Sequence, residues 1–309
     1  MNRCPICKSE SFNKIISSAK ENIKLTNNKY SYKKCANCLV ISQNPLPNNK
    51  SLNRHYQFID NLQASKENYS KKLSILFKIK ENYYKKINLR KIIRYIFKLG
   101  EEEYTYFNLL NPGNILDLGS GNGIFSLAAK QKGFEVISIE QNETSINFAK
   151  KLGVNIIPAD INSKSSMKLA SEVNNVTLNH VFEHIIEPIK FLSGLNENIR
   201  KSTKVIIVVP NSDSIWRYIF KEKWYGWDPP VHVHLYNRRS LKFIMKKLGM
   251  EIEYLSSLNR IDSLYAALIH AGFKVRKFKI ILRLLMLPTF PFLKLFNIAP
   301  EIICVARKI

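Results

Sequence analysis

Residues 115–123 of the chain read ILDLGSGNG. The stretch at 115–118 predicts a strand, and Gly119, Gly121 and Gly123 predict a tight turn that leads into a helix. Glycines let the backbone turn sharply and approach a ligand closely. The start of the following helix offers free N–H groups to an anionic group. The segment therefore predicts a ligand-binding loop, with a plain tight turn as the alternative.

Strands and helices alternate from this segment to the end of the chain. The fully apolar run at 205–209 is typical of a central parallel strand. This alternation predicts an α/β domain with a parallel sheet and helices on both of its faces. We expect strands at 115–118, 135–140, 154–157, 176–178, 205–209, 251–255 and 302–306, and helices at 123–132, 144–152 and 241–248.

Acidic side chains accompany the glycine loop. Asp117 stands just before the first glycine, and Glu140 closes the next strand, 17 residues beyond Gly123. A carboxylate at the end of the second strand can accept both ribose hydroxyls of an adenosine. The glycine spacing is G-x-G-x-G rather than the G-x-G-x-x-G of dinucleotide-binding folds. An adenosine-containing cofactor is therefore expected at this loop.

At this point the chain resembles the class I S-adenosylmethionine-dependent methyltransferases, from about residue 105 to residue 309. Residues 115–123 are similar to the first motif of that family and Glu140 to its ribose-binding acidic position. Asp160 is similar to the adenine-contacting residue of the third motif, and residues 176–188 resemble the fourth. The resemblance implies a doubly wound, seven-stranded, mostly parallel sheet with S-adenosyl-L-methionine as the cofactor. The cofactor-binding residues implied are Asp117, Gly119, Gly121, Gly123, Glu140 and Asp160.

The subgroup that the chain resembles methylates small molecules, including sugars and quinone precursors. A similar proline-proline-histidine-aromatic segment stands at residues 229–236 of this chain. The family often has an acidic residue just before the fourth strand, where this chain has two asparagines, at positions 174 and 175.

Two histidine-containing segments follow the fourth and fifth strands. His180, Glu183 and His184 have spacing that would place them on one face of a helix, at the ligand-binding edge of the sheet. His184 is a candidate general base, the three residues together are a candidate divalent-metal site, or Glu183 and His184 cap the helix start. The later aromatic segment carries His232, which would shape an acceptor pocket or hydrogen-bond within an aromatic cluster. We predict that His184, His232 and Glu183 are catalytic and that both imidazoles face one pocket.

Four of the five cysteines form two C-x2-C pairs, Cys4 with Cys7 and Cys35 with Cys38. Two tight pairs of thiolates suit a tetrahedral zinc ion without an open position, which would be structural. A redox pair or incidental thiols are the alternatives. Some sugar methyltransferases have a similar N-terminal cysteine module. We therefore divide the chain into a zinc-ribbon-like module (1–45), a helical linker or cap (46–110) and the catalytic domain (111–309).

The composition is strongly basic, with 48 Lys and Arg against 24 Asp and Glu and a formal charge of +24. This favours an acidic partner, unless the excess only reflects composition. Residues 71–98 form a basic, helically periodic stretch, and residues 278–299 are largely apolar. Together they suggest contact with an anionic membrane, with a solvated helix and a core-packing insertion as the alternatives. No apolar leader or membrane span is evident, so we expect a cytoplasmic protein, at most peripheral to the inner face of the membrane.

The leading prediction is an enzyme that methylates a small molecule, with a sugar or a lipid-linked glycan as candidate acceptors. A nucleic-acid-binding protein or RNA methyltransferase, using the cysteine module and the basic stretch, is the alternative. Methyltransferases of RNA bases often have an Asn/Asp-Pro-Pro-aromatic motif after the fourth strand, and residues 179–182 lack it. A cofactor-binding pseudoenzyme is a third possibility, against which the complete glycine loop argues.

Overall fold

The computed structural model describes residues 3–19, 29–48, 51–52, 55 and 102–309. The predicted basic helical stretch at 71–98, and most of the predicted linker at 46–110, lie outside the described residues. Within the described ranges, no helix has the length and apolar character needed to cross a membrane.

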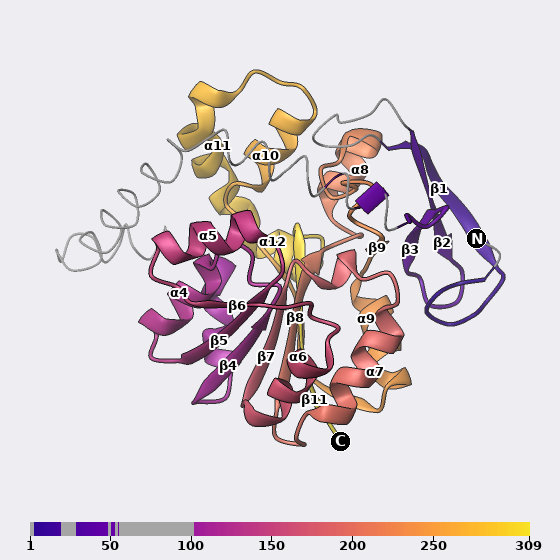
Figure 1. Cartoon of the computed structure of the whole chain (residues 1–309). Coiled ribbons are helices and arrows are strands. Elements are labelled where there is room, and N and C mark those ends of the chain that lie inside the picture. Colours follow the sequence, from indigo (N-terminus) through magenta and orange to yellow (C-terminus); the bar gives the residue numbers. More distant parts are fainter. Residues whose placement is uncertain (1–2, 20–28, 49–50, 53–54, 56–101) are drawn as a thin grey trace.

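A seven-stranded sheet forms the centre of the fold (Figure 1). Its strand order is β10-β11-β8-β7-β4-β5-β6. Neighbouring strands from β8 to β6 run parallel, whereas β11 runs antiparallel to both β8 and β10. The strands are β4 (Asn114–Leu118), β5 (Glu135–Glu140), β6 (Ile156–Pro158), β7 (Asn175–Asn179), β8 (Lys204–Pro210), β10 (Met250–Leu258) and β11 (Glu301–Lys308).

Helices cover both faces of this sheet because its central strands are apolar on both sides. In β8, Val205, Ile207 and Val209 pack on one face with residues of α6, α7 and α9, while Ile206 and Val208 pack on the other with residues of η1 and α4. This alternation is the period of two of an extended strand. The longer helical elements are η1 (Glu102–Leu109), α4 (Ile124–Gln131), α5 (Glu143–Lys151), α6 (Lys164–Leu169), α7 (Pro188–Asn198), α8 (Ile215–Phe220) and α9 (Arg238–Lys247). Short 3-10 turns are η2 (Ala170–Glu172), η3 (Phe182–His184) and η4 (Lys221–Lys223).

A helical excursion separates the last two strands of the sheet. It comprises α10 (Ser263–His270), α11 (Lys279–Met286) and α12 (Phe290–Leu295), joined by the short turns η5 (Arg276–Phe278) and η6 (Leu287–Thr289). These helices stand above the sheet in Figure 1, on the same side as α8, which follows β8. They therefore lie over the edge at which the parallel strands end.

A second, four-stranded sheet contains the N-terminal residues and one strand from much later in the chain. Its order is β1 (Phe12–Ala19), β2 (Tyr30–Cys35), β3 (Ile41–Asn44) and β9 (His234–Leu235). All three pairings are antiparallel. The predicted 1–45 module is thus a hairpin-based unit whose sheet continues into the predicted catalytic domain.

The predicted fold class is confirmed: the sheet is doubly wound, seven-stranded and mostly parallel. The seven strands and the helices predicted at 123–132, 144–152 and 241–248 are present, with ends shifted by a few residues. The structure differs at 180–184, where a helix was expected. There His180 has a positive φ of 53° at the end of β7, and only the single turn η3 follows.

Candidate active site

The glycine loop joins β4 to α4 with a backbone that suits glycine. Gly119, Gly121 and Gly123 have φ values of 70°, 53° and 74°, in the left-handed region that other residues rarely adopt. A Cβ at Gly119 would lie 2.6 Å from Cγ2 of Val181, so the loop contacts the segment after β7 closely. A Cβ at Gly121 would meet no atom within 4 Å. The loop is therefore packed against Val181 at Gly119 and open at Gly121, as expected of a loop that binds a ligand.

Glu140, at the end of β5, lies against this loop. Its Oε2 accepts a hydrogen bond from the Gly121 amide at 2.9 Å. Its Oε1 accepts hydrogen bonds from the amides of Gln141 (2.8 Å) and Asn142 (2.9 Å). Each carboxylate oxygen can accept two hydrogen bonds, so Oε2 keeps capacity for a hydroxyl group. Glu140 thus orients the loop and still offers an acceptor beside Gly121.

Asp160 occupies the same edge of the sheet, one strand further out. The Ala159 amide donates to the Glu140 carbonyl at 3.1 Å, so the two segments run side by side. Asp160 is exposed, and its Oδ1 accepts hydrogen bonds from the amide and the side-chain nitrogen of Asn162. The structure thus brings Asp160 near the strand end that carries Glu140.

Asp117 is placed differently, because its side chain is buried. Its carboxylate accepts hydrogen bonds of 2.8 Å from Ser126 of α4 and Thr177 of β7. Burial raises the pKa of Asp117 to about 6, although these hydrogen bonds oppose the shift. Asp117 ties the strand before the loop to the helix after it, which fixes the loop's shape.

His184 and His232 approach each other from the loops after β7 and β8. Their ring centroids are 4.9 Å apart and their planes are inclined by 69°. Nδ1 of His184 lies 2.9 Å from the Val231 carbonyl, and Nδ1 of His232 lies 2.8 Å from the Gly226 carbonyl. A carbonyl can only accept, so each Nδ1 donates, and Nε2 is the ring nitrogen left to accept a hydrogen bond wherever the ring is neutral.

Glu183 completes this group. It is fully buried, and its Oε2 has no hydrogen-bond partner among the described residues. One potential ligand atom from each of Glu183, His184 and His232 lies within 4.8 Å of the other two. The candidate metal-ligand group thus contains His232 in place of the predicted His180. We call these three residues the Glu-His-His cluster.

His180 belongs to a charged network that shares Glu183 with the cluster. Its Nδ1 lies 3.3 Å from Oε1 of Glu183, and its Nε2 lies 3.3 Å from Oε1 of Glu301, which also pairs with Arg260. Burial alone would lower the pKa of His180, but the two carboxylates outweigh it and raise the pKa to about 10. Burial likewise opposes ionisation of Glu301, yet Arg260 and His180 lower its pKa to about 2. His180 is therefore a fixed positive charge at neutral pH.

His184 has the opposite electrostatic character. Burial lowers the pKa of His184 to about 4, despite the opposing effect of Glu183. The imidazole is therefore neutral at physiological pH and can accept a hydrogen bond. Two neighbouring histidines thus differ in charge because one contacts two carboxylates and the other is mainly desolvated.

The raised pKa of His180 predicts a pH dependence of stability. An unfolded histidine has a pKa near 6.5, so protonated His180 stabilises the fold fully below about pH 6.5. This contribution falls as pH rises and is lost through the folded-state pKa of about 10. Asparagine tolerates a positive φ, so the His180→Asn variant should fold. Its unfolding free energy should fall less between pH 7 and 10 than that of the wild-type protein. Urea denaturation of both proteins across this range is the measurement; equal slopes would contradict the assignment.

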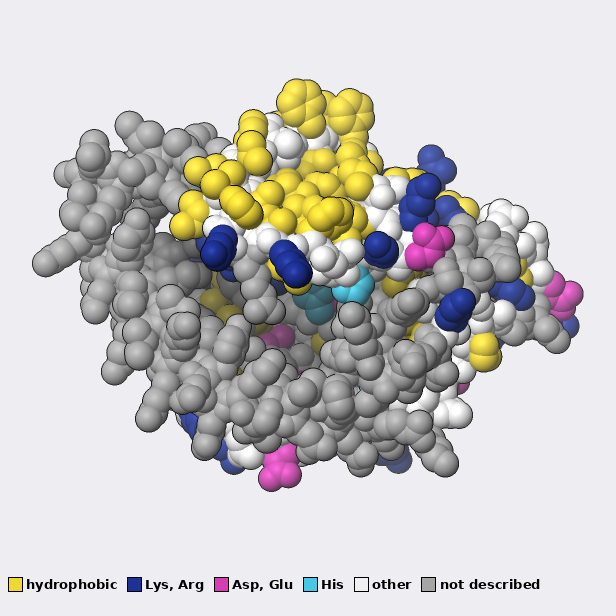
Figure 2. All heavy atoms as spheres, turned by 90° about the horizontal axis from the view of Figure 1, so that it is seen from above, with side chains coloured by type: hydrophobic (Ala, Val, Ile, Leu, Met, Phe, Trp, Pro, Cys, Tyr) yellow, Lys and Arg dark blue, Asp and Glu magenta, His cyan; other side chains and the backbone are white. Residues whose placement is uncertain are grey.

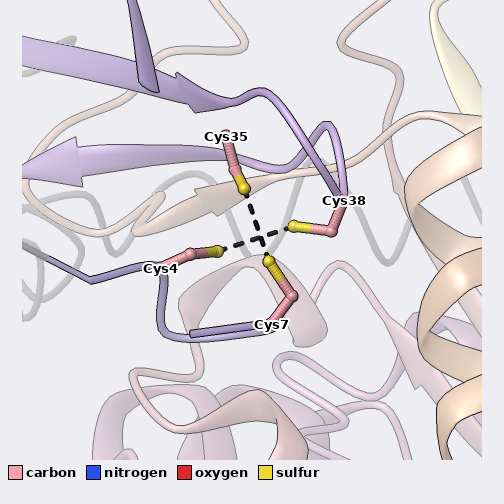
Figure 3. Close-up of side chains that lie close together, drawn as sticks. All are labelled: Cys4, Cys7, Cys35 and Cys38. Carbon is pink, nitrogen blue, oxygen red and sulfur yellow. Dashed lines mark hydrogen bonds between the residues drawn. The ribbon is translucent and has the colours of Figure 1, made fainter. Parts of the chain in front are cut away.

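The four cysteines converge from two turns (Figure 3). Sγ of Cys4 lies 3.5 Å from Sγ of Cys38, and Sγ of Cys7 lies 3.4 Å from Sγ of Cys35. One sulfur atom from each residue lies within 4.8 Å of all the others. Zn–S bonds of about 2.3 Å in a tetrahedron place sulfur atoms roughly 3.8 Å apart. The residues fit a four-thiolate zinc ion in distance, number and chemistry.

Sequence reasoning missed several residues around the site. Glu301 and Arg260 carried no recognisable signal, because a single charged residue beside a strand is ordinary and their contact depends on β11 lying between β8 and β10. His234, two residues after His232, is buried and bonds Ser42 Oγ (2.8 Å) and the Ile186 carbonyl (3.1 Å). His234 lies in the strand β9 and His232 in the loop before it, and no pattern in the sequence distinguished the two.

A methyltransferase-domain family model matches residues 85–255, more than half of the chain, so the protein belongs to that family. It is a class I methyltransferase that uses S-adenosylmethionine. A search of curated proteins gave no match.

The fold is also similar to solved methyltransferase structures. One is a SAM-dependent methyltransferase from Archaeoglobus fulgidus (21% identity, 75% of this chain and 99% of that chain covered, TM-score 0.44). A second, from Mesorhizobium loti, shares 14% identity over 67% of this chain and 98% of that chain, with a TM-score of 0.46. The plantazolicin methyltransferase BpumL with SAH shares 20% identity over 79% and 99% of the two chains, with a TM-score of 0.45.

Proposed function

We propose that S-adenosylmethionine binds at Gly119, Gly121 and Gly123, with Glu140 accepting from the ribose and Asp160 beside the adenine. The open space at Gly121 and the remaining acceptor capacity of Glu140 support this placement. Asp117 acts by holding the loop, since its side chain is buried beneath it. When bound, the cofactor supplies the methyl group as an electrophile on a sulfonium.

We further propose that the acceptor binds over the Glu-His-His cluster. The observation that supports this proposal most directly is the geometry of His184 and His232. Each Nδ1 hydrogen-bonds to a backbone carbonyl, and the ring centroids are 4.9 Å apart. Because Nε2 of a neutral ring is an acceptor, either ring can take a hydrogen bond from an acceptor hydroxyl. When the acceptor oxygen takes the methyl group from the sulfonium, Nε2 would receive the hydroxyl proton. Glu183, buried alongside, stabilises the resulting imidazolium.

We take the acceptor to be a small hydroxylated molecule, with a sugar or a lipid-linked glycan as the leading candidate. A neutral imidazole such as that of His184 suits a hydroxyl, which must be oriented and deprotonated. The four cysteines are proposed to hold a structural zinc, because the site has no open position. The 1–45 segment is then a zinc-ribbon-like module, and 111–309 is the catalytic domain. Methylation of RNA is the alternative that an acceptor screen would reveal.

The cofactor site is tested through Glu140. Glu140→Ala should weaken binding of S-adenosylhomocysteine about 5- to 150-fold, equivalent to about 1–3 kcal/mol for lost charge-assisted hydrogen bonds. Isothermal titration calorimetry measures the change. Glu143→Ala, an exposed carboxylate in the first turn of α5, is the matched control and should bind normally. Equal affinities of the two variants, or binding of NAD without a response to S-adenosylhomocysteine, would contradict the assignment.

A further inference from the structure

The helices α10 to α12 expose a large apolar surface. Nine large apolar side chains between residues 273 and 296 are each more than half exposed, out of twelve such residues in the described parts of the chain. Figure 2, seen from above the helices of Figure 1, shows a large area of yellow side chains on this side of the molecule. We call this surface the α10–α12 patch. Its members are Phe273, Phe278, Ile280, Ile281, Leu284, Leu285, Phe292, Leu295 and Phe296.

The patch is the outer face of a segment whose inner face is already packed. Met286, Phe290 and Leu293 are buried in one cluster with Trp224 and Trp227. The exposed residues are therefore additional to those that stabilise the fold. Monomeric soluble proteins rarely expose so many contiguous apolar residues, and such a surface usually meets a partner or a membrane.

The charge of the segment indicates which partner fits. Residues 263–299 contain six Lys or Arg and no Asp or Glu. Arg283 and Lys279 pair with Asp262, which precedes the segment, while Lys274, Lys277 and Lys294 are exposed. Figure 2 shows basic side chains along the border of the apolar area. Apolar side chains bordered by basic residues match a membrane interface with anionic headgroups.

The same charges argue against a second copy as the occupant. Two copies meeting through this patch would bring their basic borders together, and each chain carries a formal charge of +24. An anionic bilayer would instead attract that charge. We propose that the α10–α12 patch docks the enzyme on an anionic lipid bilayer.

Docking in this way would orient the acceptor site, a consequence that rests on the proposed function. Trp224 and Trp227, which pack beneath the patch, belong to the loop that carries His232. Histidine side chains are visible beside the patch when the molecule is viewed from above (Figure 2). A membrane-bound enzyme would therefore hold this edge of the sheet near the bilayer surface, where a lipid-linked acceptor is presented.

The test is co-sedimentation of the full chain with vesicles of phosphatidylcholine alone or mixed with phosphatidylglycerol. Wild-type protein should bind the anionic vesicles and release as salt rises. Ile280→Glu should weaken that binding about tenfold or more, because it places a carboxylate in the patch. Ile309→Glu is the matched control: the two isoleucines are 72% and 69% exposed, and only Ile280 lies in the patch. Affinity for S-adenosylhomocysteine should be unchanged in both variants.

Several outcomes would overturn the proposal. Absence of wild-type binding to anionic vesicles would do so, as would equal losses in the two variants. A wild-type dimer that Ile280→Glu dissociates, without vesicle binding, would assign the patch to a second copy instead. None of these results bears on the cofactor site, which the Glu140 variant tests separately.

Discussion

His184→Ala is expected to lower turnover by about 10²–10⁴-fold while leaving affinity for S-adenosylhomocysteine nearly unchanged. The imidazole is neutral at physiological pH, and its free Nε2 is the atom proposed to accept the hydroxyl proton. His232→Ala should also reduce turnover, and the double variant should lose less than the product of the two single effects if both rings serve one acceptor. Formation of S-adenosylhomocysteine with the best acceptor from a panel of free and nucleotide-linked sugars is the measurement.

His234→Ala provides the contrast to these variants. His234 is buried and both of its ring nitrogens have partners within the protein, so its loss should reduce the free energy of unfolding by about 1–3 kcal/mol. If His184→Ala behaves in the same way, losing stability but keeping its turnover per folded molecule, then the histidine pair is structural and the catalytic proposal is wrong.

A second substitution with a large expected effect removes two of the four clustered cysteines. Cys4→Ser combined with Cys7→Ser should abolish binding of about one equivalent of zinc and unfold the N-terminal strands. A four-thiolate zinc site contributes on the order of 10 kcal/mol to the folding of a small module. Elemental analysis of the purified protein, with limited proteolysis of residues 1–45, measures both changes. Cys304→Ala, which removes a buried thiol far from the cluster in sequence, should keep the metal.

The number of bound metal ions also distinguishes between two roles of the Glu-His-His cluster, acid–base catalysis and binding of a divalent ion. One equivalent, lost with the cysteines, fits the acid–base proposal for the histidines. A second equivalent that is lost in His184→Ala would assign a divalent ion to the Glu-His-His cluster and change the proposed role of its imidazoles. An ordered N-terminal sheet in metal-free protein would instead refute the structural zinc.

The sequence predicted best what depends on short stretches of chain. The apolar run at 205–209, the three glycines and the two cysteine pairs each impose local geometry, and all have their expected place in the fold. The contact between His184 and His232 could not be predicted from a short stretch, because it depends on the packing of two loops that are far apart in the sequence. The hydrogen bond between His184 and the Val231 carbonyl, 47 residues apart, is part of this packing. The charged partners of His180 depended on the sheet order, which no local pattern encodes.

The apolar stretch at 278–299 shows a different limit. Its composition was evident, but hydrophobicity alone does not say which side chains face the protein. Met286, Phe290 and Leu293 are buried whereas Ile280, Leu284 and Leu295 are exposed, although all six are similarly apolar. The distinction depends on which face of each helix packs against Trp224 and Trp227, in the loop after β8.

The pairing of β3 with β9 has a consequence for biosynthesis. Ser42 and His234, which hydrogen-bond across these strands, are 192 positions apart. During translation the N-terminal hairpin emerges early, yet one border of its sheet stays unpaired until nearly 200 further residues have left the ribosome. Unpaired strand edges favour aggregation, so β3 is an aggregation-prone edge of the nascent chain until β9 pairs with it. The loop that carries His232 is then fixed late in synthesis, on strands that left the ribosome long before it.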